Sequence, residues 1–120
     1  MKIALAEDHL PFRQNVKRLL ENEPDFQVIF EASNGLEVIE ELHSLESDVL
    51  VLDLSMPEVD GFEVLKHTRV KRPALKSIVL SGHKGNEYND KALEMGASAY
   101  VLKDNLFTDL IPAVRKAVIG

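Results

Sequence analysis

Five short, uninterrupted apolar runs separated by amphipathic segments restrict the fold of this chain more than any other feature of its sequence. The runs occupy residues 3–6, 28–30, 49–54, 78–80 and 99–102. A short apolar run without polar alternation is typical of a β-strand covered on both faces, as in parallel sheets. The sequence therefore predicts five buried, parallel strands.

Amphipathic segments follow the runs, and their apolar residues recur at the three- and four-residue spacing of helices. Pro11 stands in the opening turn of the first segment, where a missing N–H does no harm. The stripes predicted to face the core in the second, fourth and fifth segments are Leu36, Ile39 and Leu42; Ala92, Leu93 and Met95; and Leu110, Val114, Ala117 and Val118. Thr108 is the predicted N-cap of the fifth helix, because Pro112 would disrupt a helix that began much earlier.

Strands and helices that alternate at intervals of about 24 residues leave room for one domain, spanning residues 1–120. Because crossovers between parallel strands are right-handed, such a chain folds into a doubly wound α/β sheet with helices on both faces. Of the two common strand orders, the flavodoxin-like order 2-1-3-4-5 suits five strands. In that (βα)5 arrangement the ligand crevice lies beside strands one and three.

Composition excludes several classes of function. Hydrophobic residues make up 45% and charged residues 28% of the chain, as in an ordinary globular domain. A net charge of −6 argues against direct nucleic-acid binding, which needs clustered lysine and arginine. Cysteine is absent, which excludes disulfides and thiolate metal sites. The apolar runs fall well short of the ~18 residues of a membrane span, and no signal-peptide pattern precedes the first strand, so we expect a cytoplasmic domain without membrane contact.

Charged residues close three of the predicted strands: Glu7 and Asp8 follow the first, Asp53 follows Val49–Leu52 at the end of the third, and Lys103 follows the fifth. Taken singly, such an acid is most often a helix N-cap or a solvated turn residue, and such a lysine is a surface residue. Here the strand order brings these strand ends towards one crevice. Three carboxylates and one ammonium gathered there predict a site for a divalent cation and a phosphate group.

Magnesium is the cation that these residues favour, because it prefers oxygen ligands and binds through one or two carboxylates plus phosphate oxygens. Asp8 and Asp53 can supply the carboxylates, with Glu7 acting through water. A carboxylate can also attack phosphorus and form an acyl phosphate. Lys103 would then offer its ammonium, and Ser81 at the end of the fourth strand its hydroxyl, to the phosphoryl oxygens.

Five groups of residues, in order along the chain, carry a family resemblance: Ala6-Glu7-Asp8-His9, Asp53-Leu54-Ser55-Met56-Pro57 with Asp60-Gly61, Ser81-Gly82, Gly96-Ala97, and Tyr100-Val101-Leu102-Lys103. Together they resemble the receiver domain of bacterial two-component response regulators. Phe12-Arg13 after the acid pair, and residues 113–120, are similar to the NarL/FixJ (LuxR-type) group.

The resemblance implies a role for each site residue. Asp53 is the implied phosphoacceptor, and a sensor histidine kinase donates the phosphoryl group in the presence of Mg²⁺. The implied metal ligands are Asp8, Asp53, the backbone carbonyl of Ser55 and, through water, Glu7. The implied phosphate-contacting and switch residues are Lys103, Ser81 and Tyr100. The residues implied to modulate the lifetime of the phosphate are Ser55 and His83.

The resemblance also implies an output. Phosphorylation, which the domain itself catalyses and later reverses, is expected to switch its conformation, promote a homodimer and control transcription. DNA is then contacted only through a C-terminal helix-turn-helix domain, which we expect to be absent from this chain. A stand-alone receiver acting by protein–protein interaction or in a phosphorelay is the alternative. An aspartate-based phosphatase is disfavoured because Ser55 stands where a second aspartate is usual, and a constitutive binding module because the acid pair and Lys103 are present.

Overall fold

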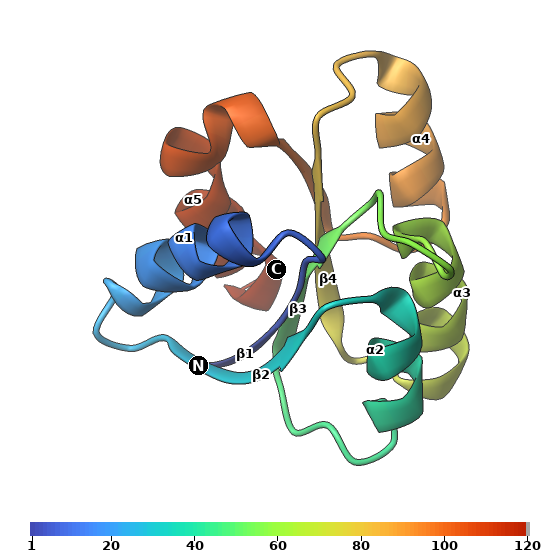
Figure 1. The fold of residues 1–120 in the computed structure, drawn as a ribbon, viewed down its shortest axis with the longest axis horizontal. Coiled ribbons are helices and arrows are strands. Elements are labelled where there is room, and N and C mark those ends of the chain that lie inside the picture. The colour runs from blue at the N-terminus through green and yellow to red at the C-terminus, as the bar shows by residue number, and fades with distance from the viewer. Residues whose placement is uncertain (120) are drawn as a thin grey trace.

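The apolar runs form the strands of one parallel sheet in the computed structural model, which describes residues 1–119 (Figure 1). The strands are β1 (Lys2–Ala6), β2 (Gln27–Ala32), β3 (Val49–Asp53), β4 (Lys76–Ser81) and β5 (Ala99–Leu102). Within the described residues, the order in the sheet is β2-β1-β3-β4-β5, and each neighbouring pair is parallel. The predicted fold class and strand order are confirmed.

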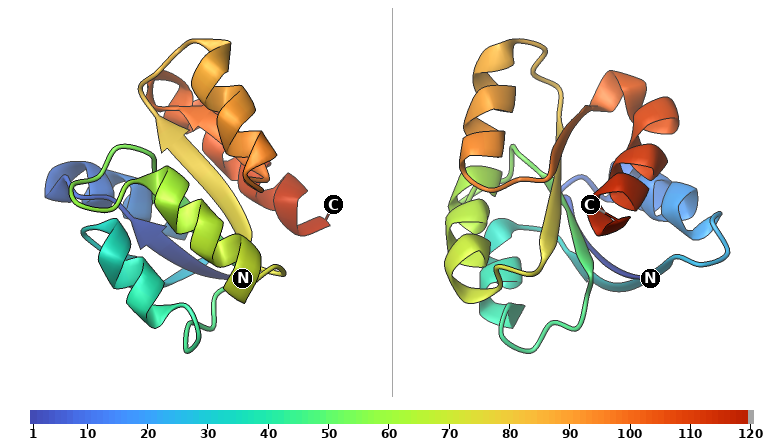
Figure 2. Two further views of the ribbon diagram at one scale, coloured as in Figure 1. Left: turned by 90° about the vertical axis from the view of Figure 1, so that its right-hand side faces the viewer. Right: turned by 180° about the vertical axis from the view of Figure 1, so that it is seen from behind.

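Helices connect the strands and cover both faces of the sheet. They are α1 (Leu10–Glu21), α2 (Gly35–Glu41), α3 (Gly61–Lys71), α4 (Asn86–Glu94) and α5 (Leu106–Ile119), and a short 3₁₀ helix, η1 (Lys103–Asn105), leads into α5. The helices α1 and α5 lie on one face, and α2, α3 and α4 lie on the other (Figures 1 and 2). Within residues 1–119, no helix is both long and apolar enough to cross a membrane.

A hydrophobic core forms on each face, because successive side chains of a strand point to opposite sides of the sheet. Ile3 and Leu5 of β1 belong to the core beneath α1 and α5, whereas Ala4 and Ala6 belong to the core beneath α2, α3 and α4. The central strand β3 alternates in the same way and is buried along its whole length. These cores hold the ends of β1 and β3 side by side.

The strand β2 departs from the predicted pattern because it lies at the edge of the sheet. Its residues alternate between exposed and partly buried up to the buried Ala32, and Ile29 is exposed. The prediction that each strand is covered on both faces is therefore wrong for β2. An edge strand has a neighbour on one side alone, so the helices that cover the sheet extend across it less completely.

Three residues predicted to face the core lie at the surface instead: Leu36 of α2, Leu93 of α4 and Val118 of α5. In α2 the buried positions are Gly35 and Val38, and the buried Leu42 follows directly after the helix. A helix of two turns offers two overlapping apolar stripes, and packing against its neighbours selects one of them. The periodicity of the sequence alone does not determine which stripe is buried.

The predicted N-cap of α5 is also wrong. The chain enters α5 directly from η1, so Thr108 lies inside the helix, where its hydroxyl donates to the Asn105 carbonyl at 3.1 Å. Pro112 is accommodated because it is exposed. The Thr108 carbonyl, which loses its helical donor, therefore lies on the solvent side, where water can satisfy it.

Candidate functional site

The ends of β1 and β3 bring three carboxylates together. Ala6 pairs with Leu52 across these strands. The next residues, Glu7 and Asp53, are therefore neighbours at the C-terminal ends of the two strands. Carboxylate oxygens of Glu7, Asp8 and Asp53 all lie within 4.8 Å of one another. The predicted convergence of these three residues is confirmed.

Lys103 joins this group from the end of β5. Its Nζ atom lies 3.1 Å from Oε1 of Glu7 and 3.2 Å from Oδ1 of Asp53. Both acids are buried, with exposed fractions of 0% for Glu7 and 2% for Asp53, so each needs a partner charge. The ring of Phe12, in the first turn of α1, lies 4.7 Å from the ammonium and adds a cation–π contact. Lys103 therefore neutralises part of the charge that the fold gathers here.

The pKa values of the site reflect this balance of charge. Desolvation of the partly buried ammonium acts to lower the pKa of Lys103, but the attraction of Asp53 and Glu7 outweighs it, and the net shift is upward. Desolvation, followed by hydrogen bonding with and repulsion from Glu7, raises the pKa of Asp8. Three carboxylates share one ammonium, so the site keeps an excess of negative charge that a cation would relieve.

The donors at this site fit magnesium. Carboxylate oxygens are hard ligands, and those of Glu7, Asp8 and Asp53 are close enough together to serve one ion. Ser55 lines the same cavity, which has a volume of about 470 Å³. The other residues of its lining are His9, Pro11, Phe12, Asn15 and Lys103. The residues that can hold the metal are therefore the three acids, with Ser55 beside them.

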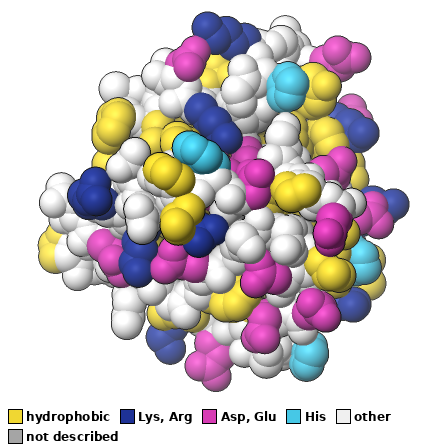
Figure 3. Space-filling view, viewed as in Figure 1, with side chains coloured by type: hydrophobic (Ala, Val, Ile, Leu, Met, Phe, Trp, Pro, Cys, Tyr) yellow, Lys and Arg dark blue, Asp and Glu magenta, His cyan; other side chains and the backbone are white. Residues whose placement is uncertain are grey.

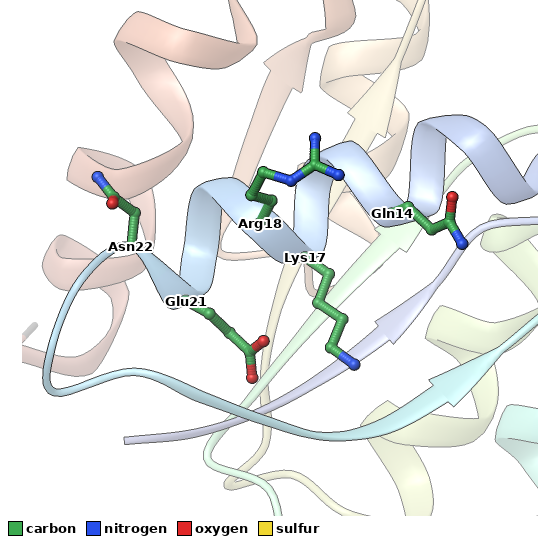
Figure 4. Close-up of a pocket in the computed structure, with 5 residues that line it drawn as sticks. All are labelled: Gln14, Lys17, Arg18, Glu21 and Asn22. Carbon is green, nitrogen blue, oxygen red and sulfur yellow. The ribbon is translucent and has the colours of Figure 1, made fainter.

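A larger depression, of about 530 Å³, lies along α1 (Figure 4). Its lining residues are Gln14, Lys17, Arg18, Glu21 and Asn22, which belong to α1 or directly follow it. They mix both signs of charge, as does the wider surface, where acidic and basic side chains are interspersed (Figure 3). The acidic cavity instead gathers three carboxylates and one ammonium from separate strand ends. Its chemistry makes it the candidate functional site.

Contacts that the sequence did not predict hold the acid pair in place. The Glu7 N–H donates to the Ala32 carbonyl at 3.0 Å, and the Arg13 guanidinium donates to the Glu7 carbonyl at 2.8 Å. A side-chain oxygen of Glu7 accepts from the N–H of His9 at 3.2 Å. In the sequence, the feature that places Phe12 and Arg13 near the site is their position in the first turn of a helix that begins soon after the acid pair.

Ser81, His83 and Tyr100 form a second group at the end of β4. The Ser81 hydroxyl accepts from the His83 N–H at 3.0 Å, and the Tyr100 hydroxyl donates to the His83 carbonyl at 2.7 Å. The ring of His83 stacks on Tyr88 of α4 with centroids 4.1 Å apart, and Tyr88 stacks in turn on Phe62 of α3 at 6.1 Å. The loop after β4 is therefore tied to β5, α4 and α3, and its histidine ring packs against α4.

Comparison with known proteins identifies the family to which this geometry corresponds. The family described as the response regulator receiver domain matches residues 3–115. The chain is 40% identical over 118 residues to the nitrate/nitrite response regulator protein NarL of Escherichia coli strain K12, covering 98% of this chain and 55% of that protein. It is 35% identical over 120 residues to the transcriptional regulatory protein DegU of Brevibacillus brevis, covering 100% of this chain and 51% of that protein. The chain thus spans about half the length of these curated relatives.

A solved structure agrees with these sequence relationships. The crystal structure of a LuxR-family two-component response regulator from Aurantimonas sp. matches this fold with a TM-score of 0.94 and 31% sequence identity. The match covers 99% of this chain and 85% of that one.

Proposed function

Because this chain belongs to the response regulator receiver family, we propose that it accepts a phosphoryl group on Asp53 from the phosphohistidine of a sensor kinase. The observation that carries the proposal is the placement of Asp53. It ends the buried central strand, within 4.8 Å of the Glu7 and Asp8 carboxylates and 3.2 Å from the Lys103 ammonium. The carboxylate of Glu7 is also buried, but it already accepts from the Lys103 ammonium and from the N–H of His9, which precedes α1.

In the proposed reaction, a carboxylate oxygen of Asp53 attacks the phosphorus of the phosphohistidine. The bond from phosphorus to the imidazole nitrogen breaks, its electron pair stays on the nitrogen, and an acyl phosphate forms on Asp53. Mg²⁺ bound by Asp8, Asp53 and the Ser55 carbonyl, with Glu7 acting through water, would neutralise charge on the transferred group. Hydrolysis of the acyl phosphate by water later restores the Asp53 carboxylate and releases inorganic phosphate.

Lys103 and Ser81 are the residues we propose to sense the new phosphoryl group. The raised pKa of Lys103 keeps its ammonium charged at neutral pH, so it can exchange its contact with Asp53 for one with a phosphoryl oxygen. The Ser81 hydroxyl accepts from the His83 N–H, and within residues 1–119 its own proton makes no hydrogen bond, so it can be donated to the phosphate. Movement of Ser81 would displace the loop of His83, and with it the hydroxyl contact of Tyr100.

For the output, we propose control of transcription through a DNA-binding domain outside this chain, with a homodimer formed on phosphorylation. The names of the NarL and DegU relatives, which describe regulatory proteins about twice as long, support this assignment. The net charge of −6 supports the view that the receiver itself does not contact DNA. A stand-alone receiver acting through protein–protein contacts or a phosphorelay is the second candidate, because the acidic cavity serves either purpose.

Phosphorylation of the purified chain by acetyl phosphate tests the proposal. Intact-mass spectrometry should show an adduct of about 80 Da on the wild type in Mg²⁺, and none on Asp53→Asn. Asp48→Asn is the matched control: it lies just before the opposite end of β3, where its side chain accepts from the Lys2 N–H, and it should be phosphorylated normally. An adduct that persists on Asp53→Asn would show that another residue is the acceptor.

A further inference from the structure

The first residue of α2, Gly35, lies closer to the loop between β3 and α3 than any residue with a side chain could. A Cβ atom on Gly35 would lie 2.3 Å from the Val59 carbonyl oxygen and 2.9 Å from Cγ2 of Val64. Contacts of this kind below 3.0 Å essentially do not occur in proteins. The main obstacle is a backbone oxygen, so a side-chain rotation cannot remove it.

The loop that Gly35 contacts is the segment that follows the proposed phosphoacceptor. It spans residues 54–60 and carries Ser55 on the wall of the acidic cavity. Hydrogen bonds fix both of its ends: the Leu54 N–H donates to the Leu80 carbonyl, and the Gly61 N–H donates to the Leu54 carbonyl, each at 2.9 Å. A displacement of Val59 is therefore transmitted along a short, tied segment towards Ser55.

On its other side, Gly35 is connected to the acid pair. Two residues separate it from the end of β2, and the carbonyl of Ala32 at that end accepts from the Glu7 N–H at 3.0 Å. Asn34 caps α2 by accepting from the Glu37 N–H at 2.9 Å, which fixes the start of the helix next to that strand end. The contact between Gly35 and Val59 thus joins the segment that holds Glu7 to the loop that carries Ser55.

We propose that Gly35 is a positioning residue for the metal site, which sets the spacing between the Glu7–Asp8 segment and the Ser55 loop. A methyl group on Gly35 has to push one of the two away by about 1 Å, and either movement widens the site. Mg²⁺ demands near-ideal octahedral geometry, so it tolerates such a change poorly. This inference rests on the proposed function, because it assumes that the acidic cavity binds Mg²⁺.

The test is Mg²⁺ binding to the whole chain by isothermal titration calorimetry, compared between wild type and Gly35→Ala. Loss of residues that orient metal ligands typically weakens metal affinity 10- to 100-fold, and we expect the Kd of Gly35→Ala to rise by about that factor. Phosphorylation of Asp53 by acetyl phosphate should then need more Mg²⁺, while its maximal rate at saturating Mg²⁺ stays close to that of the wild type. A merely structural role would not shift the Mg²⁺ requirement in this way.

Two controls separate positioning from loss of stability. Val38→Ala truncates a fully buried residue of the same helix and should lower the Tm without changing the Kd for Mg²⁺. Gly85→Ala adds a methyl group where nothing lies within 4 Å, at the N-cap of α4, and should leave the Kd unchanged. An equal rise in Kd for Val38→Ala, or an unchanged Kd for Gly35→Ala, would overturn the positioning role.

A second variant covers the case in which Gly35→Ala does not fold. Val59→Gly keeps the carbonyl but removes the side chain, whose Cγ1 atom lies 3.0 Å from the position of a Cβ on Gly35, and it frees the backbone of the loop without introducing a clash. It should also weaken Mg²⁺ binding, and an unchanged Kd would overturn the proposal. Failure of the proposed function has a different signature. Wild-type protein that neither binds Mg²⁺ nor forms the Asp53 adduct would refute the metal site itself, and the role of Gly35 with it.

Discussion

Replacing Lys103 by methionine tests whether its ammonium is the charge that makes the acidic cavity stable. Lys103→Met keeps an unbranched apolar side chain but removes the nitrogen that lies 3.1 Å from Glu7 and 3.2 Å from Asp53. Without this cation, the buried carboxylates of Glu7 and Asp53 repel each other and the carboxylate of Asp8. We expect the variant to be less stable than the wild type at neutral pH in magnesium-free buffer.

The burial of the ion pair sets the expected decrease in the free energy of unfolding. Removal of one partner from a buried ion pair costs about 3–5 kcal/mol. The Lys103 side chain is 29% exposed, so water already screens part of the attraction, and we expect about 2–3 kcal/mol. For a domain of 120 residues this corresponds to a fall in Tm of about 8–12 °C.

Thermal unfolding followed by circular dichroism, at pH 7.5 with a chelator present, measures the loss. The difference from wild type should shrink as the pH falls, because protonation of Asp8, whose pKa is raised, relieves part of the repulsion, and it should also shrink in Mg²⁺. Lys84→Met is the control, because its ion pair with Asp104 is exposed and should contribute little. A Tm difference that does not respond to pH or to Mg²⁺ would refute this electrostatic account of Lys103.

The site carries three more predictions. Asp8→Asn removes a carboxylate with a raised pKa, and such an acid destabilises the folded state only above its unfolded pKa. Without Mg²⁺ the variant should therefore melt up to about 5 °C higher than the wild type at pH 7, whereas the two proteins should melt at the same temperature near pH 3. A Tm difference between variant and wild type that is the same at both pH values would contradict this. Mg²⁺ at about 100 times its Kd should stabilise the wild type by about 2.7 kcal/mol and Asp8→Ala much less, and equal Tm shifts would remove Asp8 from the metal site. Beryllofluoride, a phosphoryl mimic, should shift the NMR signals of Tyr100 and residues 84–96, and changes confined to the surroundings of Asp53 would exclude the switch.

The meeting of the acids was predictable because it depends on strand identity and strand order alone. Once residues 3–6 and 49–54 were interpreted as neighbouring parallel strands, Glu7 and Asp53 had to lie at the same edge of the sheet. Asp8 follows from its position in the chain. Lys103 follows β5, which is separated from β3 by β4, and the long lysine side chain spans that distance to Asp53.

Other features depend on how helices and loops pack, which sequence periodicity does not determine. The placement of Phe12 beneath the ammonium depends on the rotation of α1 about its axis. The stack of His83 on Tyr88 depends on the path of the loop after β4. The prediction of Thr108 as the N-cap of α5 was wrong for the same reason, because η1 continues directly into α5 and no side-chain cap is needed.

The group around His83 gives the protein a built-in optical probe. The chain contains two tyrosines and no tryptophan. Tyr88 stacks on the His83 ring and Tyr100 donates to its carbonyl, so both chromophores contact the same residue. The tyrosine emission of the unlabelled protein therefore originates entirely beside the loop after β4. Time-resolved fluorescence can follow that loop during phosphorylation without an introduced dye.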